Sequence, residues 1–310
     1  MECPAPFRIP EAAREGFSDG GAYDAYRATY PSAVVDSFLD KIKVKGRGRA
    51  RIVEVGAGTG KFTERLVERQ EKYEVVAVEP LAGMRAQLAD KELGGSGSRV
   101  KLVDGHAGGI PLEDGWGDAA VVAQAFHWFA DEGALEEIAR VLKPMAVLGM
   151  IWNVEDSGER DADNKPKDWQ ASTKWEQKLN DMVHSLPDDG HPRFRHSKWQ
   201  DVFTSQLAST PLQALLRGGA SGKTPRFSLP LGEERVPFSI WLSEDELWRR
   251  MCTLSQMAII VKKGGDEAQE LRRRFDEALN GDDVERNDKG EVKIHGQTYF
   301  AWTDKIGGYY

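Results

Sequence analysis

One stretch of the chain decides the fold, and it reads Arg51-Ile52-Val53-Glu54-Val55-Gly56-Ala57-Gly58-Thr59-Gly60-Lys61-Phe62-Thr63. Its apolar, β-branched first part predicts a buried strand, the three alternating glycines predict a sharp turn, and a helical pattern follows at once. Backbone N–H groups at such a turn can face a ligand, and glycine allows close approach because it has no Cβ. The stretch therefore predicts a cofactor-binding loop, with an ordinary glycine-rich loop as the alternative.

The composition is that of a globular protein. The chain has 310 residues, of which 40% are hydrophobic and 30% charged, and this length suits two domains or one domain with a large insertion. No apolar run reaches the roughly 18 to 20 residues that span a bilayer, and the N-terminus lacks the basic and apolar regions of a signal peptide. We therefore expect a cytoplasmic protein that does not bind membranes.

Charge and cysteine content exclude further classes. A net charge of −8 argues against a nucleic-acid or acidic-membrane binder, because phosphate groups would repel the protein. The two cysteines, Cys3 and Cys252, offer neither a disulfide framework nor the spacing of metal ligands. We expect no metal site.

Strands and helices alternate between residues 51 and 152. The predicted strands cover 51–55, 74–79, 100–103, 118–123 and 147–152, and the predicted helices cover 61–70, 81–93 and 134–142. This alternation predicts an α/β fold with a doubly wound, mostly parallel sheet and helices on both faces. Ligands of such sheets bind beyond the carboxyl ends of the strands. That edge would hold residues 56–60, 79, 104–107 and 124–128.

The whole chain divides into four parts by its patterns. We expect an N-terminal helical flap (1–33), a core (34–154), a helical lid insertion (155–225) and a C-terminal part that completes the core sheet (226–310). Within the last part, the pattern over 247–258 predicts one helix, and that over 291–302 predicts a hairpin or strand pair around Gly296. The basic, aromatic run 193–198 is interpreted as a solvated or structural surface.

The spacing of the glycines bears on the choice of cofactor. Dinucleotide-binding loops carry G-x-G-x-x-G, whose last glycine would fall at Lys61, whereas Gly60 makes this loop G-x-G-x-G. Glu79 ends the second predicted strand, where a carboxylate can accept hydrogen bonds from both hydroxyls of a ribose. S-adenosylmethionine is therefore favoured over NAD, and a plain surface carboxylate at position 79 is the alternative.

With these features the chain resembles the class I S-adenosylmethionine-dependent methyltransferases, in the small-molecule type 11 group that includes trans-aconitate methyltransferase-like enzymes. The resemblance implies a seven-stranded Rossmann-like sheet, a methyltransferase activity and S-adenosyl-L-methionine as the cofactor. It rests on five motifs in order: Val53-Glu54-Val55-Gly56-Ala57-Gly58-Thr59-Gly60-Lys61; Val78-Glu79-Pro80 with Met84-Arg85; Gly105-His106-Ala107 with Ile110-Pro111-Leu112; Gln124-Ala125-Phe126-His127-Trp128-Phe129; and Arg140-Val141-Leu142-Lys143-Pro144.

The resemblance also implies roles for single residues. Glu79 would hold the ribose hydroxyls, Gln124 would approach the methionine portion, and Tyr30 would close over the cofactor from the N-terminal flap. The implied cofactor-binding residues are Tyr30, Glu54, Gly56, Ala57, Gly58, Glu79, Pro80, Met84, His106, Ala107 and Gln124.

The acceptor side is predicted from the residues that adjoin the same edge. A sulfonium is a strong methyl donor, so the protein has to hold the acceptor in line, which can supply roughly 7 kcal/mol of the barrier. His127 is the candidate catalytic base, and the alternative is a structural histidine hydrogen-bonded within an aromatic cluster. A carboxylate acceptor would need no base. The candidate substrate-binding residues are Tyr26, Trp128, Trp152 and Asn153.

The sequence thus predicts direct in-line methyl transfer to a small-molecule acceptor through a carboxylate, hydroxyl, thiol or amine, and it leaves this choice and the oligomeric state open. Two alternatives stand beside it. One is an NAD(P)-dependent oxidoreductase, and the other is a methyltransferase-like protein that binds the cofactor but no longer transfers methyl.

Overall fold

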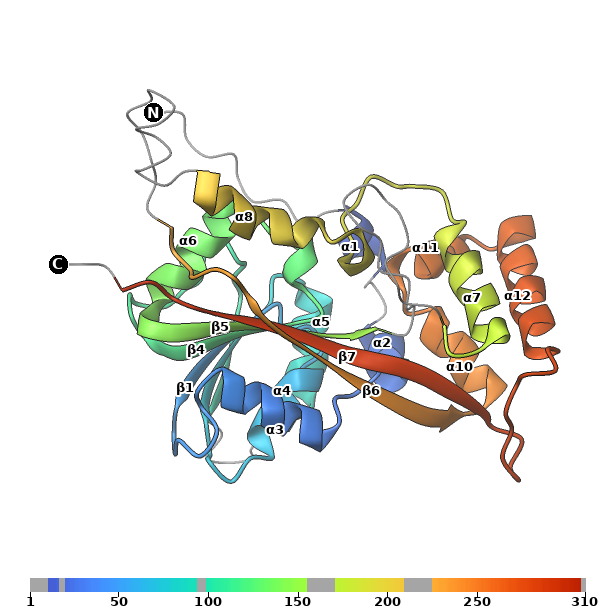
Figure 1. The fold of residues 1–310 in the computed structure, drawn as a ribbon, viewed down its shortest axis with the longest axis horizontal. Helices are drawn as coiled ribbons and strands as arrows, with labels where there is room; N and C mark the ends of the chain where they lie inside the picture. Colours follow the sequence, from blue (N-terminus) through green and yellow to red (C-terminus); the bar gives the residue numbers. More distant parts are fainter. Residues whose placement is uncertain (1–10, 17–19, 94–98, 155–170, 209–224, 308–310) are drawn as a thin grey trace.

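A computed structural model of the chain describes residues 11–16, 20–93, 99–154, 171–208 and 225–307. Its strands form one seven-stranded sheet in the order β3-β2-β1-β4-β5-β7-β6 (Figure 1). Strands β1 to β5 pair in parallel, and β7 runs antiparallel to both β5 and β6. The predicted mostly parallel, seven-stranded sheet is therefore confirmed. The strands are β1 (Arg51–Val55), β2 (Glu74–Val78), β3 (Val100–Val103), β4 (Gly117–Ala123), β5 (Leu142–Val154), β6 (Gly232–Leu242) and β7 (Val292–Asp304).

Helices cover both faces of this sheet because successive residues of its central strands are apolar and point to opposite sides. In β1, Val53 and Val55 belong to the core under helices α6 and α8, whereas Ile52 belongs to the core against α3 and α4. Figure 1 shows these two pairs of helices on opposite sides of the sheet. Their bounds are α3 (Ser32–Lys41), α4 (Lys61–Val67), α6 (Glu132–Val141) and α8 (Asp201–Ala208).

A second group of helices lies beside the sheet and forms a hydrophobic core of its own. Trp175 and Met182 from α7 pack there with Met257 from α11 and with Phe275 and Leu279 from α12. We call α7 and α10 to α12 the helical unit; Figure 1 shows it at the end of the molecule reached by β6 and β7. Its bounds are α7 (Lys174–His184), α10 (Glu244–Met251), α11 (Ser255–Lys263) and α12 (Gly265–Leu279).

Three more helices complete the described α-helices. They are α1 (Glu11–Gly16), α2 (Gly20–Tyr26) and α5 (Ala82–Asp90). Helix α1 packs against α11, and α2 packs against both α10 and α5. The N-terminal segment therefore bridges the helical unit and the sheet. Three 3-10 turns, Phe126–Trp128, Phe194–His196 and Lys198–Gln200, add to the loops at the sheet edge.

Two expectations for the C-terminal part are wrong. The predicted helix over 247–258 is two helices, because Thr253 turns back and donates from both its N–H and its Oγ1 to the Arg250 carbonyl, and Leu254 is extended. The predicted hairpin is the single strand β7. Gly296 lies opposite Phe238 of β6, and a Cβ at this glycine would come within 2.6 Å of the Phe238 ring. The glycine therefore makes room for a ring instead of a turn.

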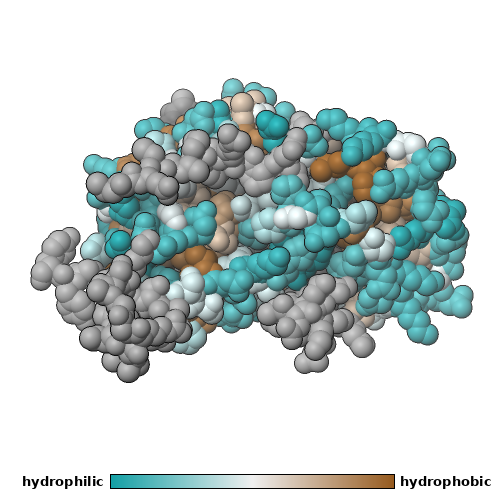
Figure 2. Space-filling view, turned by 90° about the horizontal axis from the view of Figure 1, so that it is seen from above, coloured by the Kyte–Doolittle hydropathy of each residue, from teal (hydrophilic) through white to brown (hydrophobic). Residues whose placement is uncertain are grey.

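Figure 2 shows mostly hydrophilic side chains on one face, with a few separate apolar areas, one of them over the helical unit. None of the helices within the described ranges has the length and apolar character needed to cross a bilayer.

Candidate functional site

The glycine loop follows β1 at the carboxyl edge of the sheet. Gly60 has a φ of +85°, and a Cβ there would lie 2.2 Å from Leu88 Cδ1, so this glycine permits contact between α4 and α5. Gly58 has a φ of +59°, and no atom of the described chain lies within 4 Å of a Cβ at this position. Gly58 therefore faces open space, as a loop that receives a ligand would.

Glu79 holds this loop from the end of β2. Its two carboxylate oxygens accept hydrogen bonds from the backbone N–H groups of Gly58 and Leu81, both at 2.9 Å. The side chain is buried, and burial raises the pKa of the Glu79 carboxyl against the opposing effect of these two donors. Each oxygen keeps a second lone pair. Glu79 can therefore still accept hydrogen bonds from the two hydroxyls of a ribose.

Glu54 is a second buried carboxyl group, one strand away. It lies on β1 and accepts a 2.6 Å hydrogen bond from Thr63 Oγ1. Burial raises the pKa of Glu54 to about 8, with a smaller contribution from the charge of Glu79. The group is therefore largely protonated at neutral pH, and a cation placed beside it would favour the carboxylate.

The other residues proposed for the cofactor surround this loop. The N–H groups of Gly56 and Ala57 donate to the Val78 carbonyl at 2.8 and 3.1 Å, so they join the loop to β2 and are not available to a ligand. Met84 and Ala107 are buried, and Pro80 is half-buried. His106 Nδ1 accepts the N–H of Gly108 at 3.2 Å.

Tyr30 lies deeper than a flap residue would. It is 3% exposed and packs edge-on against Phe62, with 5.1 Å between ring centroids, in the core beneath α3 and α4. Burial raises the pKa of the Tyr30 hydroxyl well above its ordinary value. In this structure the Tyr30 ring packs in the same core as Ile52 of β1.

Gln124 connects the ends of β4 and β5. Its N–H donates to the Ile151 carbonyl at 2.8 Å, and its side-chain amide donates to the Asn153 carbonyl at 2.9 Å. Gln124 also has a φ of +59°, a left-handed conformation that costs about 1 to 3 kcal/mol in a non-glycine residue and is concentrated at functional sites. The fold thus fixes this amide at the edge where the glycine loop lies.

His127 and Trp152 form a hydrogen-bonded pair behind this edge. Trp152 Nε1 donates to His127 Nδ1 at 3.2 Å. Burial lowers the pKa of His127 to about 3, and the charges of Arg193 and Arg27 act in the same direction. The Trp152 side chain is 0% exposed and packs among the rings of Phe194, Trp199 and Tyr299. The geometry matches a structural histidine in an aromatic cluster better than a general base.

A cavity lies beside Gln124 and His127, and we call it the edge chamber. Of the proposed substrate residues, Trp128 and Asn153 line it. Trp152 does not, and its ring belongs to the core. Tyr26 is not part of this lining either, and its hydroxyl accepts a 2.9 Å hydrogen bond from Arg249 on α10. The roles proposed for Trp152 and Tyr26 in substrate binding stay predictions.

Three cationic residues of the edge chamber were missed in the sequence. Arg27 follows α2, while Arg193 and Arg195 belong to the basic run that was interpreted as a surface, and all three line the chamber. Arg193 is 7% exposed. The alternation of arginine and aromatic residues in the run 193–198 was the available signal. Whether its side chains face solvent or the chamber depends on how the 3-10 turn Phe194–His196 lies at the sheet edge.

The N-terminal segment is attached to the glycine loop by polar contacts. Thr59 Oγ1 donates to Asp24 Oδ1 at 2.7 Å, and Lys91 Nζ donates to Asp24 at 2.5 Å and to Glu64 at 2.6 Å. Burial would raise the pKa of Asp24, but the hydrogen bonds from Lys91 and Thr59 outweigh it and lower the pKa. Helix α2 is therefore held directly over the loop.

Comparisons with known proteins point to one family. Residues 53–149 match a protein-family model described as a methyltransferase domain. A methyltransferase-like protein of Schizosaccharomyces pombe, itself named uncharacterized, is 36% identical over 260 residues, which are 84% of this chain and 84% of the relative.

Solved structures share the fold. The YcgJ protein of Bacillus subtilis has a TM-score of 0.50 at 16% identity, with 88% of this chain and 99% of that chain covered. Phosphoethanolamine N-methyltransferase 2 of Haemonchus contortus, solved with phosphomonomethylethanolamine and S-adenosylhomocysteine, also has a TM-score of 0.50, at 11% identity over 98% of this chain and 61% of that chain. Because the likeness to the yeast relative extends over most of both chains, this chain belongs to the class I S-adenosylmethionine-dependent methyltransferases of the type 11 group.

Proposed function

We propose that the protein transfers the methyl group of S-adenosylmethionine, in line and without a covalent enzyme intermediate, to a small molecule bound in the edge chamber. The observation that carries this proposal is Glu79. A buried carboxylate at the end of β2 accepts the N–H of Gly58 and retains lone pairs beside an open glycine loop. This is the arrangement that a ribose diol requires.

The residues on either side of the loop would have different roles. Glu79 and Gly58 would hold the ribose, and Glu54 would lie beside the cationic methionine portion. When bound, the cofactor supplies a methyl group activated on a sulfonium. Gln124 and Asn153, fixed by the hydrogen bond between them, form the boundary to the edge chamber. Alignment of the acceptor across this boundary is the main contribution expected from the protein.

The helical unit and the N-terminal segment would act as the cover of the site. Val183 of α7, Leu254 and Met257 line the edge chamber on the side that the sheet leaves open. We therefore assign the lid to α7, which lies within the expected insertion 155–225, together with α11, and the flap to α2. Exclusion of water by such a cover strengthens the electrostatic contacts inside the site.

Isothermal titration calorimetry with S-adenosylmethionine tests the role of Glu79. We expect Glu79→Ala to weaken binding by about 10- to 100-fold, because a hydrogen bond to a charged group contributes about 1.5 to 3 kcal/mol. Glu79→Gln, which keeps one acceptor oxygen, should fall between this variant and the wild type. Glu74→Ala, at the opposite end of β2, is the matched control and should bind normally.

Unchanged affinity in Glu79→Ala would refute the cofactor assignment. Two further measurements address the other function classes. A thermal shift with NAD but not with S-adenosylmethionine would favour an oxidoreductase. Tight cofactor binding without release of S-adenosylhomocysteine in the presence of any acceptor from a broad panel would favour a protein that no longer transfers methyl.

A further inference from the structure

The side chain of Gln124 offers the edge chamber a hydrogen-bond acceptor. Its Nε2 donates to the Asn153 carbonyl at 2.9 Å. Only the nitrogen of an amide can donate to a carbonyl, so this bond fixes which end of the amide is which. Gln124 is half-buried, and its Oε1 has no hydrogen-bond partner within the described part of the chain. The chamber therefore has an acceptor that no protein donor uses.

His127 offers the same chamber a donor. Trp152 Nε1 donates to His127 Nδ1 at 3.2 Å. An indole nitrogen can only donate, so Nδ1 carries no proton and the neutral imidazole has its N–H at Nε2. This nitrogen has no partner among the residues that the structure describes, and it is not fully buried. The Nε2–H is therefore available to a ligand.

The two atoms belong to one end of the edge chamber. Gln124 and His127 both line it. They are attached to neighbouring residues of β5, since His127 accepts from the Trp152 side chain and Gln124 donates to the Asn153 carbonyl. Neighbouring Cα atoms are about 3.8 Å apart. The fold thus places a fixed acceptor and a fixed donor where one polar group can meet both.

The charged side chains of this lining are engaged by the protein itself. Arg193 donates to both carboxylate oxygens of Asp189 at 2.8 and 2.6 Å, and to the His191 carbonyl at 3.0 Å. Arg27 and Arg195, which also line the chamber, have partners as well. A ligand anion would have to compete with these partners for the guanidinium groups.

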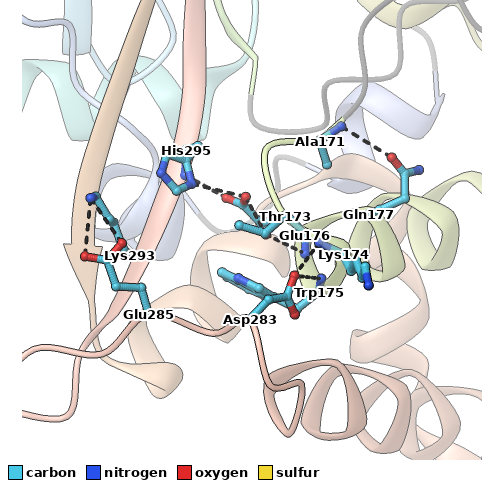
Figure 3. Close-up of polar contacts among 10 residues, drawn as sticks. All are labelled: Ala171, Thr173, Lys174, Trp175, Glu176, Gln177, Asp283, Glu285, Lys293 and His295. Atoms are coloured by element: carbon cyan, nitrogen blue, oxygen red, sulfur yellow. Dashed lines mark hydrogen bonds and ion pairs between the residues drawn. The ribbon is translucent and has the colours of Figure 1, made fainter.

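A ligand cation finds no better partner nearby. The described lining of the edge chamber contains no aspartate or glutamate. A second cavity, between α7, α10 and β7, adjoins it through the shared residues Asn153 and Val183, and the carboxylate of that cavity is Glu176. Its oxygens accept the His295 N–H and the Thr173 hydroxyl, both at 2.7 Å. Figure 3 shows the Glu176 carboxylate pointing toward His295 on β7.

The remaining donor and acceptor together favour an uncharged group. A carboxylate has acceptors only, so one of its oxygens would face Gln124 Oε1. An ammonium or amidinium has donors only and would face the N–H of His127. A polar atom buried without a partner costs about 1 to 3 kcal/mol. A carboxamide or a hydroxyl satisfies both sides, because each is at once a donor and an acceptor.

We propose that Gln124 and His127 determine specificity by selecting a methyl acceptor that carries an uncharged carboxamide or hydroxyl group. The N–H or O–H of this group donates to Gln124 Oε1, and its oxygen accepts the Nε2–H of His127. The two contacts orient the acceptor in the edge chamber and involve no proton transfer. This inference rests on the proposed function, because it names a group of the second substrate of the same site.

The test is a binding series on the full chain saturated with S-adenosylhomocysteine. Calorimetry would compare benzamide with analogues of nearly the same shape: acetophenone lacks the donor, benzamidinium lacks the acceptor, and benzoate has acceptors only. Benzyl alcohol is the hydroxyl probe. We expect benzamide or benzyl alcohol to bind at least about tenfold more tightly than these analogues. Comparison of benzamide with benzyl alcohol decides between carboxamide and hydroxyl.

Variants assign the two contacts. Gln124→Glu leaves only acceptors at this position and should shift the preference from benzamide to benzamidinium. His127→Phe removes the donor and should reduce the advantage of benzamide over benzamidinium, whereas His127→Gln, which keeps an N–H, should retain part of it. Gln70→Glu, at an exposed glutamine after α4, is the matched control and should bind as the wild type does. Thermal unfolding of each variant shows whether it is folded.

The outcomes separate the two proposals. If S-adenosylhomocysteine itself fails to bind, the proposed function is refuted. If it binds normally but one of the analogues binds as tightly as benzamide and benzyl alcohol, or if neither of these two binds, the selection of an uncharged group is refuted and the proposed function stands. The same holds if Gln124→Glu and His127→Phe are folded and both leave the order of affinities unchanged.

Discussion

Trp152 Nε1 donates a hydrogen bond to His127 Nδ1 at 3.2 Å, so the imidazole carries its proton on Nε2. A neutral histidine in this tautomer presents a donor, and it can accept a second proton only by giving up the indole contact. Burial lowers the pKa of His127 to about 3. In this state His127 is better suited to positioning a neighbouring group than to removing a proton from the acceptor.

The first prediction concerns the protonation of His127. Nitrogen-15 NMR of the imidazole should show the Nε2–H tautomer with no titration between pH 5 and pH 8.5, because the neutral form persists down to the lowered pKa of about 3. The variant His127→Gln assigns the signal. A titration midpoint inside this range, or a proton on Nδ1, would contradict the hydrogen-bond pattern and restore the general base.

The second prediction concerns Glu54, whose folded-state pKa is raised to about 8 from 4.5. Between these two values the unfolded chain loses its proton while the folded chain keeps it, so stability is full below about pH 4.5 and falls as the pH rises toward 8. The total effect is at most about 5 kcal/mol. We expect Glu54→Gln to match the wild type in urea denaturation at pH 5 and to exceed it at pH 8.5.

A control and a second measurement complete this test. Glu68→Gln, which changes an exposed carboxylate just after α4, is the control for the removal of a carboxylate from the surface. In the cofactor titration at pH 8, Glu54→Gln should bind S-adenosylmethionine more weakly, because the cationic ligand loses its carboxylate. If Glu54→Gln is no more stable than the wild type at pH 8.5, Glu54 is ionised in the folded wild-type chain when no cofactor is bound.

The third prediction compares two glycines of the same loop. Both have positive φ angles, so alanine at either costs about 1 to 2 kcal/mol of backbone strain. Gly60→Ala adds a clash with Leu88 at 2.2 Å and should lower stability clearly more than Gly58→Ala, whose Cβ meets no atom within 4 Å. Gly58→Ala should instead reduce cofactor affinity. Equal unfolding midpoints for the two variants would contradict the packing assigned to Gly60.

The core of the fold could be predicted because its signals are local. The five parallel strands are apolar, β-branched runs, and their carboxyl ends bring Glu79, Gln124 and Asn153 together through topology alone. The direction in which a side chain points was harder to predict from the sequence. Trp152 and Asn153 are neighbours on β5, yet alternation sends the indole into the core while Asn153 lines the edge chamber.

The acceptor side depends on contacts between distant segments. Arg193 reaches the edge chamber through the 3-10 turn Phe194–His196, and nothing in the run 193–198 by itself tells whether it faces solvent or the site. Gly296 was similarly misinterpreted, because a glycine that yields to a ring on a neighbouring strand looks in sequence like a glycine that turns. Both cases require knowledge of the partner segment.

The last prediction concerns Asp24, which joins α2 to the glycine loop through Thr59 and to α5 through Lys91. Asp24→Ala removes the acceptor of both bonds, so α2 should open more often while the sheet keeps its stability. Hydrogen exchange of residues 20–26 should rise by about tenfold, the equivalent of 1.4 kcal/mol, with no change in β1 or β4. Asp90→Ala, which removes an exposed carboxylate next to Lys91, is the control.

Because the loop is part of the cofactor site, S-adenosylhomocysteine should slow this exchange in the wild type and less so in Asp24→Ala. Equal exchange in the wild type and Asp24→Ala would show that packing against α10, and not this ion pair, holds α2 over the loop.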